Sequence, residues 1–167
     1  MTNRPNEQES RAKEFLGRVG RITRRVKWKK SQVESLEELA TGCSAQISDM
    51  PRSPSPNLQR VETLVCKIAD LKESIKADEA TLDDAKIELA LMICRIPNET
   101  QQQVLTERYL NLYGWQDVIE NVGYSRTHVF RAHEDGLCMV ESLLAADEYG
   151  RDYDGTKMGL DGTTMGL

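Results

Sequence analysis

The chain has 167 residues, with 22 Lys and Arg against 27 Asp and Glu and a net charge of −5. This length suits one compact domain, or a small domain with an extended appendage. We expect no membrane span, because no run of about 18 apolar residues exists. Residues 1–10 are polar and lack the apolar core of a secretory signal.

The cysteine pattern argues against metal binding and disulfides. The four cysteines lie more than 20 residues apart, without a C-x-x-C pair. That spacing argues against a zinc site or a disulfide framework and favours a reducing cytoplasm. Cys66, Cys94 and Cys138 are expected to pack as small apolar groups.

Composition and motifs also argue against an enzyme. Aromatic residues make up only 5% of the chain and charged residues 29%, which favours an all-α architecture with much solvated surface. No Ser/His/Asp set, glycine-rich phosphate loop or carboxylate pair in an apolar setting stands out, so we predict no catalytic residue and no cofactor. His128 and His133 are five residues apart, which is not the spacing of a helical metal pair, so no metal is expected.

The charge is unevenly distributed along the chain. Residues 11–30 contain nine bases and one acid, whereas residues 31–100 contain seven bases and thirteen acids. Seven of these bases form what we call the basic stripe: Arg18, Arg21, Arg24, Arg25, Lys27, Lys29 and Lys30. Such asymmetry is typical of a contact with a polyanion or an acidic protein surface. The alternative is a solvated helix face that the following acidic helix partly offsets.

Two long helices are predicted before residue 97. In the first, apolar residues recur at alternating steps of three and four, with one polar member at Lys29. The positions of this first seam are Ala12, Phe15, Val19, Ile22, Val26, Lys29, Val33, Leu36 and Ala40. Gly42 is predicted to end the helix.

The second seam has the same spacing and one polar member, Asp78. Its positions are Val61, Leu64, Ile68, Leu71, Ile75, Asp78, Leu82, Ala85, Leu89, Met92 and Ile96. Asn57 is a suitable N-cap for this helix, and Pro97 ends it. Prolines forbid helix between Pro51 and Pro56.

These features predict a long antiparallel coiled-coil hairpin over residues 11–96, with a Pro-rich tip at 41–57. In that arrangement Lys29 and Asp78 lie near each other, and lone polar residues in a seam usually set its register. The alternative is that each helix pairs with another subunit of a homo-oligomer.

The two ends of the chain are predicted to be disordered. Residues 1–10 are polar, and residues 147–167 contain a tandem DGTxMGL repeat rich in Gly, Asp and Thr. The repeat is either a docking motif or a silent duplication.

A compact helical domain is predicted over residues 97–146. Asn98 followed by Gln101 is typical of a capping box at a helix start, and this helix is expected to reach Leu110. A short helix over residues 115–122 follows it.

The last two helices have the spacing of a helix-turn-helix. Gly123 supplies the positive φ of a tight turn, and Ser125 caps a third helix with apolar positions every three or four residues. The start of such a helix enters a major groove, where Arg bonds guanine bidentately and Thr or Phe contacts a thymine methyl. The predicted DNA-contacting residues are Ser125, Arg126, Thr127, His128, Phe130 and Arg131. The alternative is a three-helix bundle that binds protein or no macromolecule.

The run from residue 115 to 137 resembles region four of bacterial sigma-70-type factors. That region combines a glycine-hydrophobic-serine-arginine turn with a valine three residues after the arginine. The matching positions are Val122, Gly123, Tyr124, Ser125, Arg126, Val129, Gly136 and Leu137. Residues 105–110 resemble the preceding helix of that region. The whole layout, a basic coiled coil joined to this module, is similar to phage late-transcription regulators of the ArpU and RinA kind.

The resemblance implies a phage-type, sequence-specific DNA-binding transcription regulator that acts with host RNA polymerase in the bacterial cytoplasm. The positions that it carries over as contacts to double-stranded DNA are Arg126, Thr127, His128 and Arg131. The sequence departs from the family at Gly136, where Ala is usual, and at Phe130, where a basic or polar residue is common. Glu134 and Asp135 replace typical bases.

Two other functions stay open from the residues. One is a protein-binding adaptor or inhibitor that acts through the helical hairpin, and the other is a small-terminase-like DNA-packaging protein. Residues 97–146 carry three bases against seven acids, so this module alone is expected to bind DNA phosphates weakly. The basic stripe or a polymerase partner is expected to supply the remaining affinity.

Overall fold

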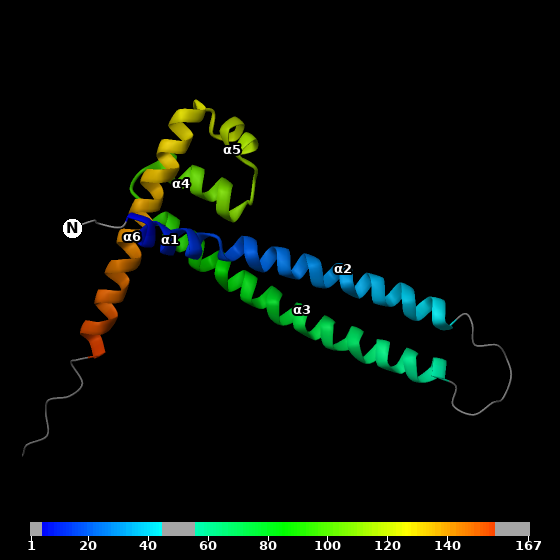
Figure 1. The fold of residues 1–167 in the computed structure, drawn as a ribbon. Helices are drawn as coiled ribbons and strands as arrows, with labels where there is room; N and C mark the ends of the chain where they lie inside the picture. The colour runs from blue at the N-terminus through cyan, green and yellow to red at the C-terminus, as the bar shows by residue number, and fades with distance from the viewer. Residues whose placement is uncertain (1–4, 45–55, 156–167) are drawn as a thin grey trace, which may run out of the picture. The chain divides into compact units, whose positions relative to one another are not determined.

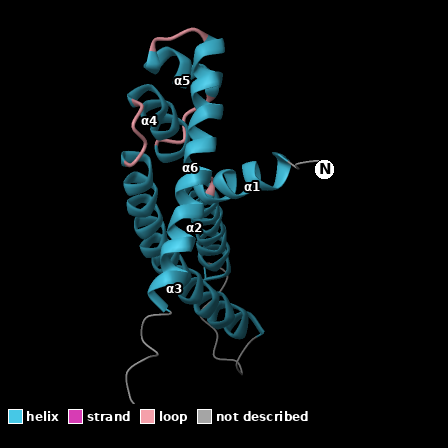
Figure 2. Cartoon of the chain, turned by 90° about the vertical axis from the view of Figure 1, so that its left-hand side faces the viewer, coloured by secondary structure: helices cyan, strands magenta, loops and turns pink. Residues whose placement is uncertain are grey.

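The computed structural model describes residues 5–44 and 56–155, and every regular element within them is a helix (Figures 1 and 2). The prediction of the all-α class is confirmed. The elements are α1 (Pro5–Leu16), α2 (Arg18–Ser44), α3 (Pro56–Cys94), α4 (Glu99–Leu105), the π-helical turn η1 (Thr106–Leu110), α5 (Trp115–Val122) and α6 (Arg126–Gly155).

The chain divides into two compact units. The α2–α3 unit is Arg18–Glu88, and the α4–α6 unit combines the described parts of Met1–Gly17 and Leu89–Leu167. The predicted boundary after residue 96 is therefore corrected, because α1 and the end of α3 belong with the C-terminal helices. Each unit is described by itself.

In the α2–α3 unit the two helices lie side by side and antiparallel (Figure 1). Glu88 Oε2 lies 2.7 Å from Arg18 Nη1, and Glu37 Oε1 lies 2.7 Å from Lys72 Nζ. The predicted proximity of Lys29 and Asp78 is confirmed. The apolar seam residues buried between the helices include Val19, Ile22, Val26, Val33, Ile75 and Ala85.

The ends of these helices differ from the prediction. α2 continues through Gly42 to Ser44, and α3 begins at Pro56, so Asn57 lies inside its first turn. Proline is favoured in the first turn because its missing N–H would have no helical partner there. Residues 45–55, most of the predicted Pro-rich tip, lie outside the described residues.

The first predicted helix is broken at Gly17. The Gly17 amide N–H donates to the Lys13 carbonyl oxygen at 2.9 Å and closes α1, and glycine is among the weakest helix formers. Leu16, rather than the predicted Phe15, is fully buried. The first seam therefore runs unbroken only within α2, from Val19 onward.

α1 begins at Pro5, so the predicted disorder of residues 1–10 is wrong from residue 5 onward. The helix packs on α6. Ala12 is fully buried, and its amide N–H donates to Glu141 Oε2 at 2.9 Å. Packing against α6 explains why a polar segment is helical here.

α6 is longer than predicted and runs to Gly155, so residues 147–155 are helical rather than disordered. Arg95 donates to both carboxylate oxygens of Asp147, at 2.7 and 2.9 Å, and Arg11 pairs with Glu148. These ion pairs tie the extension of α6 to the end of α3 and to α1. Residues 156–167, which hold most of the repeat, lie outside the described residues.

In the α4–α6 unit, α4 packs on both α5 and α6. The predicted cap is present, since Asn98 Oδ1 accepts the Gln101 amide N–H at 3.2 Å. The helix reaches Leu110 as predicted, but its last five residues form the π-helical turn η1. α4 and α6 approach closely at Gly136, where an added Cβ would lie 3.0 Å from Leu105 Cδ1.

Candidate nucleic-acid interface

The turn between α5 and α6 has the local geometry that the sequence predicts. Gly123 adopts φ +72°, and its amide N–H donates to the Ile119 carbonyl oxygen at 3.1 Å. Ser125 accepts the amide N–H of His128 at its Oγ (3.4 Å) and that of Val129 at its carbonyl oxygen (3.0 Å). Gly123 thus caps the end of α5, and Ser125 acts as the N-cap of α6.

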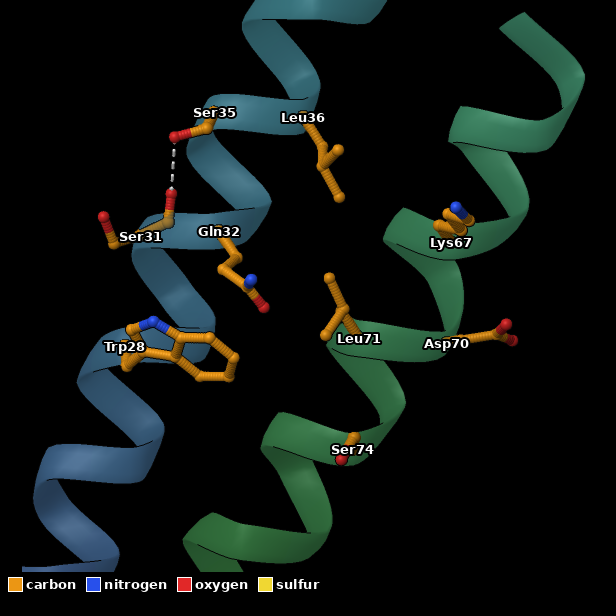
Figure 3. Close-up of a pocket in the computed structure, with 9 residues that line it drawn as sticks. All are labelled: Trp28, Ser31, Gln32, Ser35, Leu36, Lys67, Asp70, Leu71 and Ser74. Carbon is orange, nitrogen blue, oxygen red and sulfur yellow. Dashed lines mark hydrogen bonds between the residues drawn. The ribbon is translucent and has the colours of Figure 1, made fainter. Parts of the chain in front are cut away.

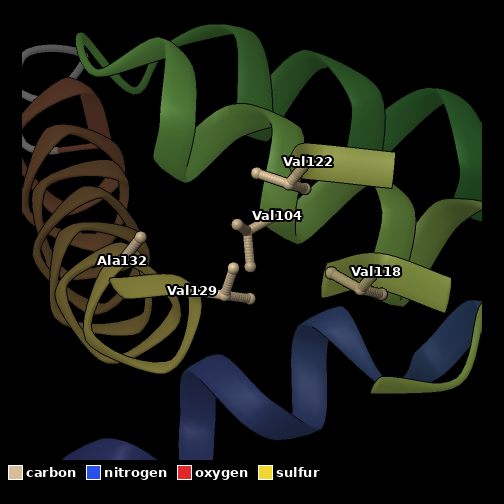
Figure 4. Packing of buried hydrophobic residues seen from close by; sticks show 5 residues of the cluster. All are labelled: Val104, Val118, Val122, Val129 and Ala132. Atoms are coloured by element: carbon tan, nitrogen blue, oxygen red, sulfur yellow. The ribbon is translucent and has the colours of Figure 1, made fainter. Parts of the chain in front are cut away.

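A small apolar cluster fixes α5 and α6 on α4. Its buried members are Val104, Val118, Val122, Val129 and Ala132, as Figure 4 shows. Trp115 and Ile119 pack against it and are partly buried. Because Val129 and Ala132 face this cluster, the opposite side of the first turns of α6 faces solvent.

The predicted DNA-contacting residues divide into two groups. Ser125, Arg126, Thr127, His128 and Arg131 are exposed, and Phe130 is half-buried. Neither Arg126 nor Arg131 forms an ion pair within the described parts of the chain. The first turn of α6 contains no acidic residue, so its positive helix end is not offset locally.

An aromatic cluster lies beside these residues. The Phe130 ring is 4.6 Å from the Trp115 ring, and Arg126 Cζ is 5.5 Å from the Phe130 ring centre. Arg108 Cζ lies 4.8 Å over the Trp115 ring, and the His133 ring meets Trp115 edge-on at 4.9 Å. A separate pair, Tyr124 and His128, has ring centres 4.8 Å apart.

His133 is the one buried polar residue among the described side chains, and the sequence predicts no role for it. Its Nε2 lies 3.0 Å from the Tyr109 hydroxyl, with which it shares a hydrogen bond. Burial, with the positive charges of Lys13 and Arg108, lowers the pKa of His133 to about 4. Its position four residues after Val129, on the core face of α6, was the available signal.

Most cations of the basic stripe form ion pairs with acidic residues of α3. Asp78 accepts from Arg25 at 2.7 and 3.1 Å and from Lys29 at 2.6 Å. The hydrogen bond from Lys29 and, to a smaller extent, that from Arg25 hold the pKa of Asp78 below its usual value. Arg18 pairs with Glu88 at 2.7 Å and Lys30 with Glu79 at 2.7 Å.

Four of the seven stripe residues therefore neutralise acids of α3. Arg24 and Lys27 are exposed and make no ion pair in the region that the structure describes. A count of charges along the sequence does not include the register of α2 against α3, so it overestimates the unpaired positive charge of the stripe.

An open groove of about 770 Å³ lies between α2 and α3 toward the tip (Figure 3). Leu36 and Leu71 lie within it, Trp28 stands at its rim and is 60% exposed, and three serines line it. Lys67 and Asp70 bring one charge of each sign. The groove contains none of the predicted site residues.

The cysteines do not pack as expected. Cys66, Cys94 and Cys138 are free and exposed, because none of them occupies a seam position. Within residues 5–44 and 56–155, no group of three or more His, Cys, Asp or Glu side chains is placed to hold a metal ion. No described helix is both long and apolar enough to cross a membrane.

No protein-family model, curated protein or solved structure matches the chain.

Proposed function

We propose that α5 and α6 form a DNA-binding helix-turn-helix, and that the protein is a phage-type, sequence-specific transcription regulator. The observation that carries this proposal is the turn at Gly123 and Ser125 followed by four exposed polar residues at the start of α6. Those residues are Arg126, Thr127, His128 and Arg131. Their chemistry suits hydrogen-bond acceptors and methyl groups in a major groove.

The electrostatics supports action together with a partner such as host RNA polymerase. The segment 97–146 carries three bases and seven acids, and four stripe residues are held by α3. Since neutralised phosphates supply most of the sequence-independent affinity, the chain alone has little of it. A partner with its own DNA contacts would make up the difference.

Selection from a random pool of double-stranded DNA tests the proposal. The intact chain is used, because α1 belongs to the same unit as α6 and a fragment from Pro97 would lack it. The selection is run with and without bacterial RNA polymerase, beside a variant carrying Arg126→Gln and Arg131→Gln. We expect an enriched motif for the wild-type chain and none for the variant.

The alternatives give different outcomes. A chain that captures polymerase but enriches no motif in either selection would be an adaptor or inhibitor. A ring-sized mass in solution, together with binding to DNA of any sequence, would favour a packaging protein.

A further inference from the structure

Phe130 is one of the residues predicted to contact DNA, but its ring already contacts Trp115 and Arg126. It is half-buried, lies 4.6 Å from the Trp115 ring and carries the Arg126 guanidinium 5.5 Å from its centre. Little of the ring is left to meet a thymine methyl. Its contacts join an exposed arginine to a ring at the edge of the core.

The Trp115 ring itself has contacts on several sides. It packs against the buried cluster of α4, α5 and α6, meets His133 edge-on at 4.9 Å and lies 4.8 Å from Arg108 Cζ. Arg108 is itself fixed, since its Nη1 donates to the Tyr113 carbonyl oxygen at 2.7 Å. A continuous stack therefore runs from the core through Trp115 and Phe130 to Arg126.

Such a stack restricts the side-chain conformations of Arg126 in the DNA-free protein. A free arginine side chain loses much rotamer freedom when it is immobilised in an interface. A guanidinium attracted to an aromatic face samples fewer orientations, and a planar donor pair held in place suits the two acceptors of guanine. Arg131 has no such ring contact in the described parts of the chain, so it serves as an internal comparison.

We propose that Phe130, backed by Trp115, is a positioning residue that orients Arg126 for guanine readout and does not itself contact DNA. The inference rests on the proposed function. In this proposal, discrimination at the base pair read by Arg126 depends on the Phe130 and Trp115 rings, which do not touch the DNA.

The test measures base discrimination with the intact chain and the duplex motif that the wild-type chain enriches. Each base pair is substituted in turn, and affinities are compared for the wild-type chain and for the Arg126→Ala, Phe130→Leu and Phe130→Tyr variants. We expect Arg126→Ala to lose about tenfold discrimination at one base pair. Phe130→Leu should lose several-fold discrimination at that same pair and none at others, and Phe130→Tyr, which keeps the ring, should stay within about twofold of wild type.

Three outcomes would overturn the inference. Full discrimination by Phe130→Leu at the Arg126 base pair would show that the ring does not position the arginine, while the proposed function would stand. A loss confined to a different, thymine-containing pair would show direct contact by Phe130. If Arg126→Ala itself changes discrimination nowhere, the proposed readout by α6 fails and the inference fails with it. Melting curves verify folding, and Phe130→Met replaces the Leu variant if that variant unfolds.

Discussion

The basic stripe of α2 and the start of α6 both present arginines at the surface, but these arginines differ in what they contact. In the stripe, Arg18, Arg25, Lys29 and Lys30 pair with acids of α3. At the start of α6, Arg126 and Arg131 make no ion pair within the described residues. The stripe keeps only Arg24 and Lys27 exposed and without an ion pair in the described parts of the chain, so its larger charge gives it no more such cations than the start of α6.

Burial separates the same two units. Val104, Leu105, Val118 and Val129 in the α4–α6 unit are fully buried, whereas toward the tip of the α2–α3 unit the seam residues are only half-buried. Two helices that pack on each other alone leave the sides of their seam in water. The proposed DNA-binding surface therefore lies on the better-packed unit.

The largest expected effect tests this difference in packing. Leu105→Ala should lower the free energy of unfolding by roughly 2–5 kcal/mol, since it leaves a cavity in a closed core. Leu71→Ala, the matched change in the half-buried seam, should cost about 1 kcal/mol. Urea denaturation followed by circular dichroism measures both, and equal losses would contradict the comparison.

Acid should weaken the α4–α6 unit before the ion pairs of the α2–α3 unit. The folded pKa of His133, about 4, lies below the value of about 6.5 expected in the unfolded chain. The unfolded state therefore binds the proton first, so the stability due to neutral His133 is complete above about pH 6.5 and is lost as the pH falls toward 4. The total is on the order of 3 kcal/mol.

The controls for this pH dependence lie in the same protein. His133→Gln should remove it from unfolding curves between pH 6.5 and 4, while His128→Gln, at an exposed position, should leave it unchanged. The pKa of Asp78 is lowered by Lys29 and Arg25, so these pairs should persist until the pH falls below the usual carboxyl range. Loss of the Asp78 ion pairs already at pH 6 would contradict the expectation that the α4–α6 unit is weakened first.

A smaller effect is expected at the crossing of α4 and α6. Gly136→Ala would gain about 1 kcal/mol of helix propensity, but the new Cβ would lie 3.0 Å from Leu105 Cδ1. Leu105 is fully buried and has little room to move, and overpacking costs about 1–3 kcal/mol. We expect a net loss of about 1 kcal/mol in thermal or urea unfolding, and a gain in stability would show that Leu105 can repack.

Local patterns in the sequence could predict much of this molecule. The bounds of α5, the turn at Gly123, the cap at Ser125 and the pairing of Lys29 with Asp78 all follow from spacing or residue type. Each depends on neighbours in sequence or on a repeating period, which a single chain displays directly.

Contacts between distant segments could not be predicted in the same way. The packing of α1 on α6 brings together distant parts of the chain, and the stack of Arg108, Trp115 and Phe130 joins three elements. The other ion pairs of the stripe, made by Arg18, Arg25 and Lys30, needed the register of α2 against α3. Periodicity predicts which face of a helix is buried, but not which side chain of another element will meet it.

The central claim, that base readout lies at the start of α6 and not on the basic stripe, is tested most directly by two variants with equal loss of charge. One carries Arg126→Gln and Arg131→Gln, and the other carries Arg24→Gln and Lys27→Gln. Affinity is measured for the selected duplex and for a scrambled duplex at one salt concentration. We predict that the first variant lowers the ratio of the two affinities by at least about 30-fold, and that the second changes both affinities alike and keeps the ratio within about twofold. A ratio that falls in the stripe variant and persists in the α6 variant would contradict the account.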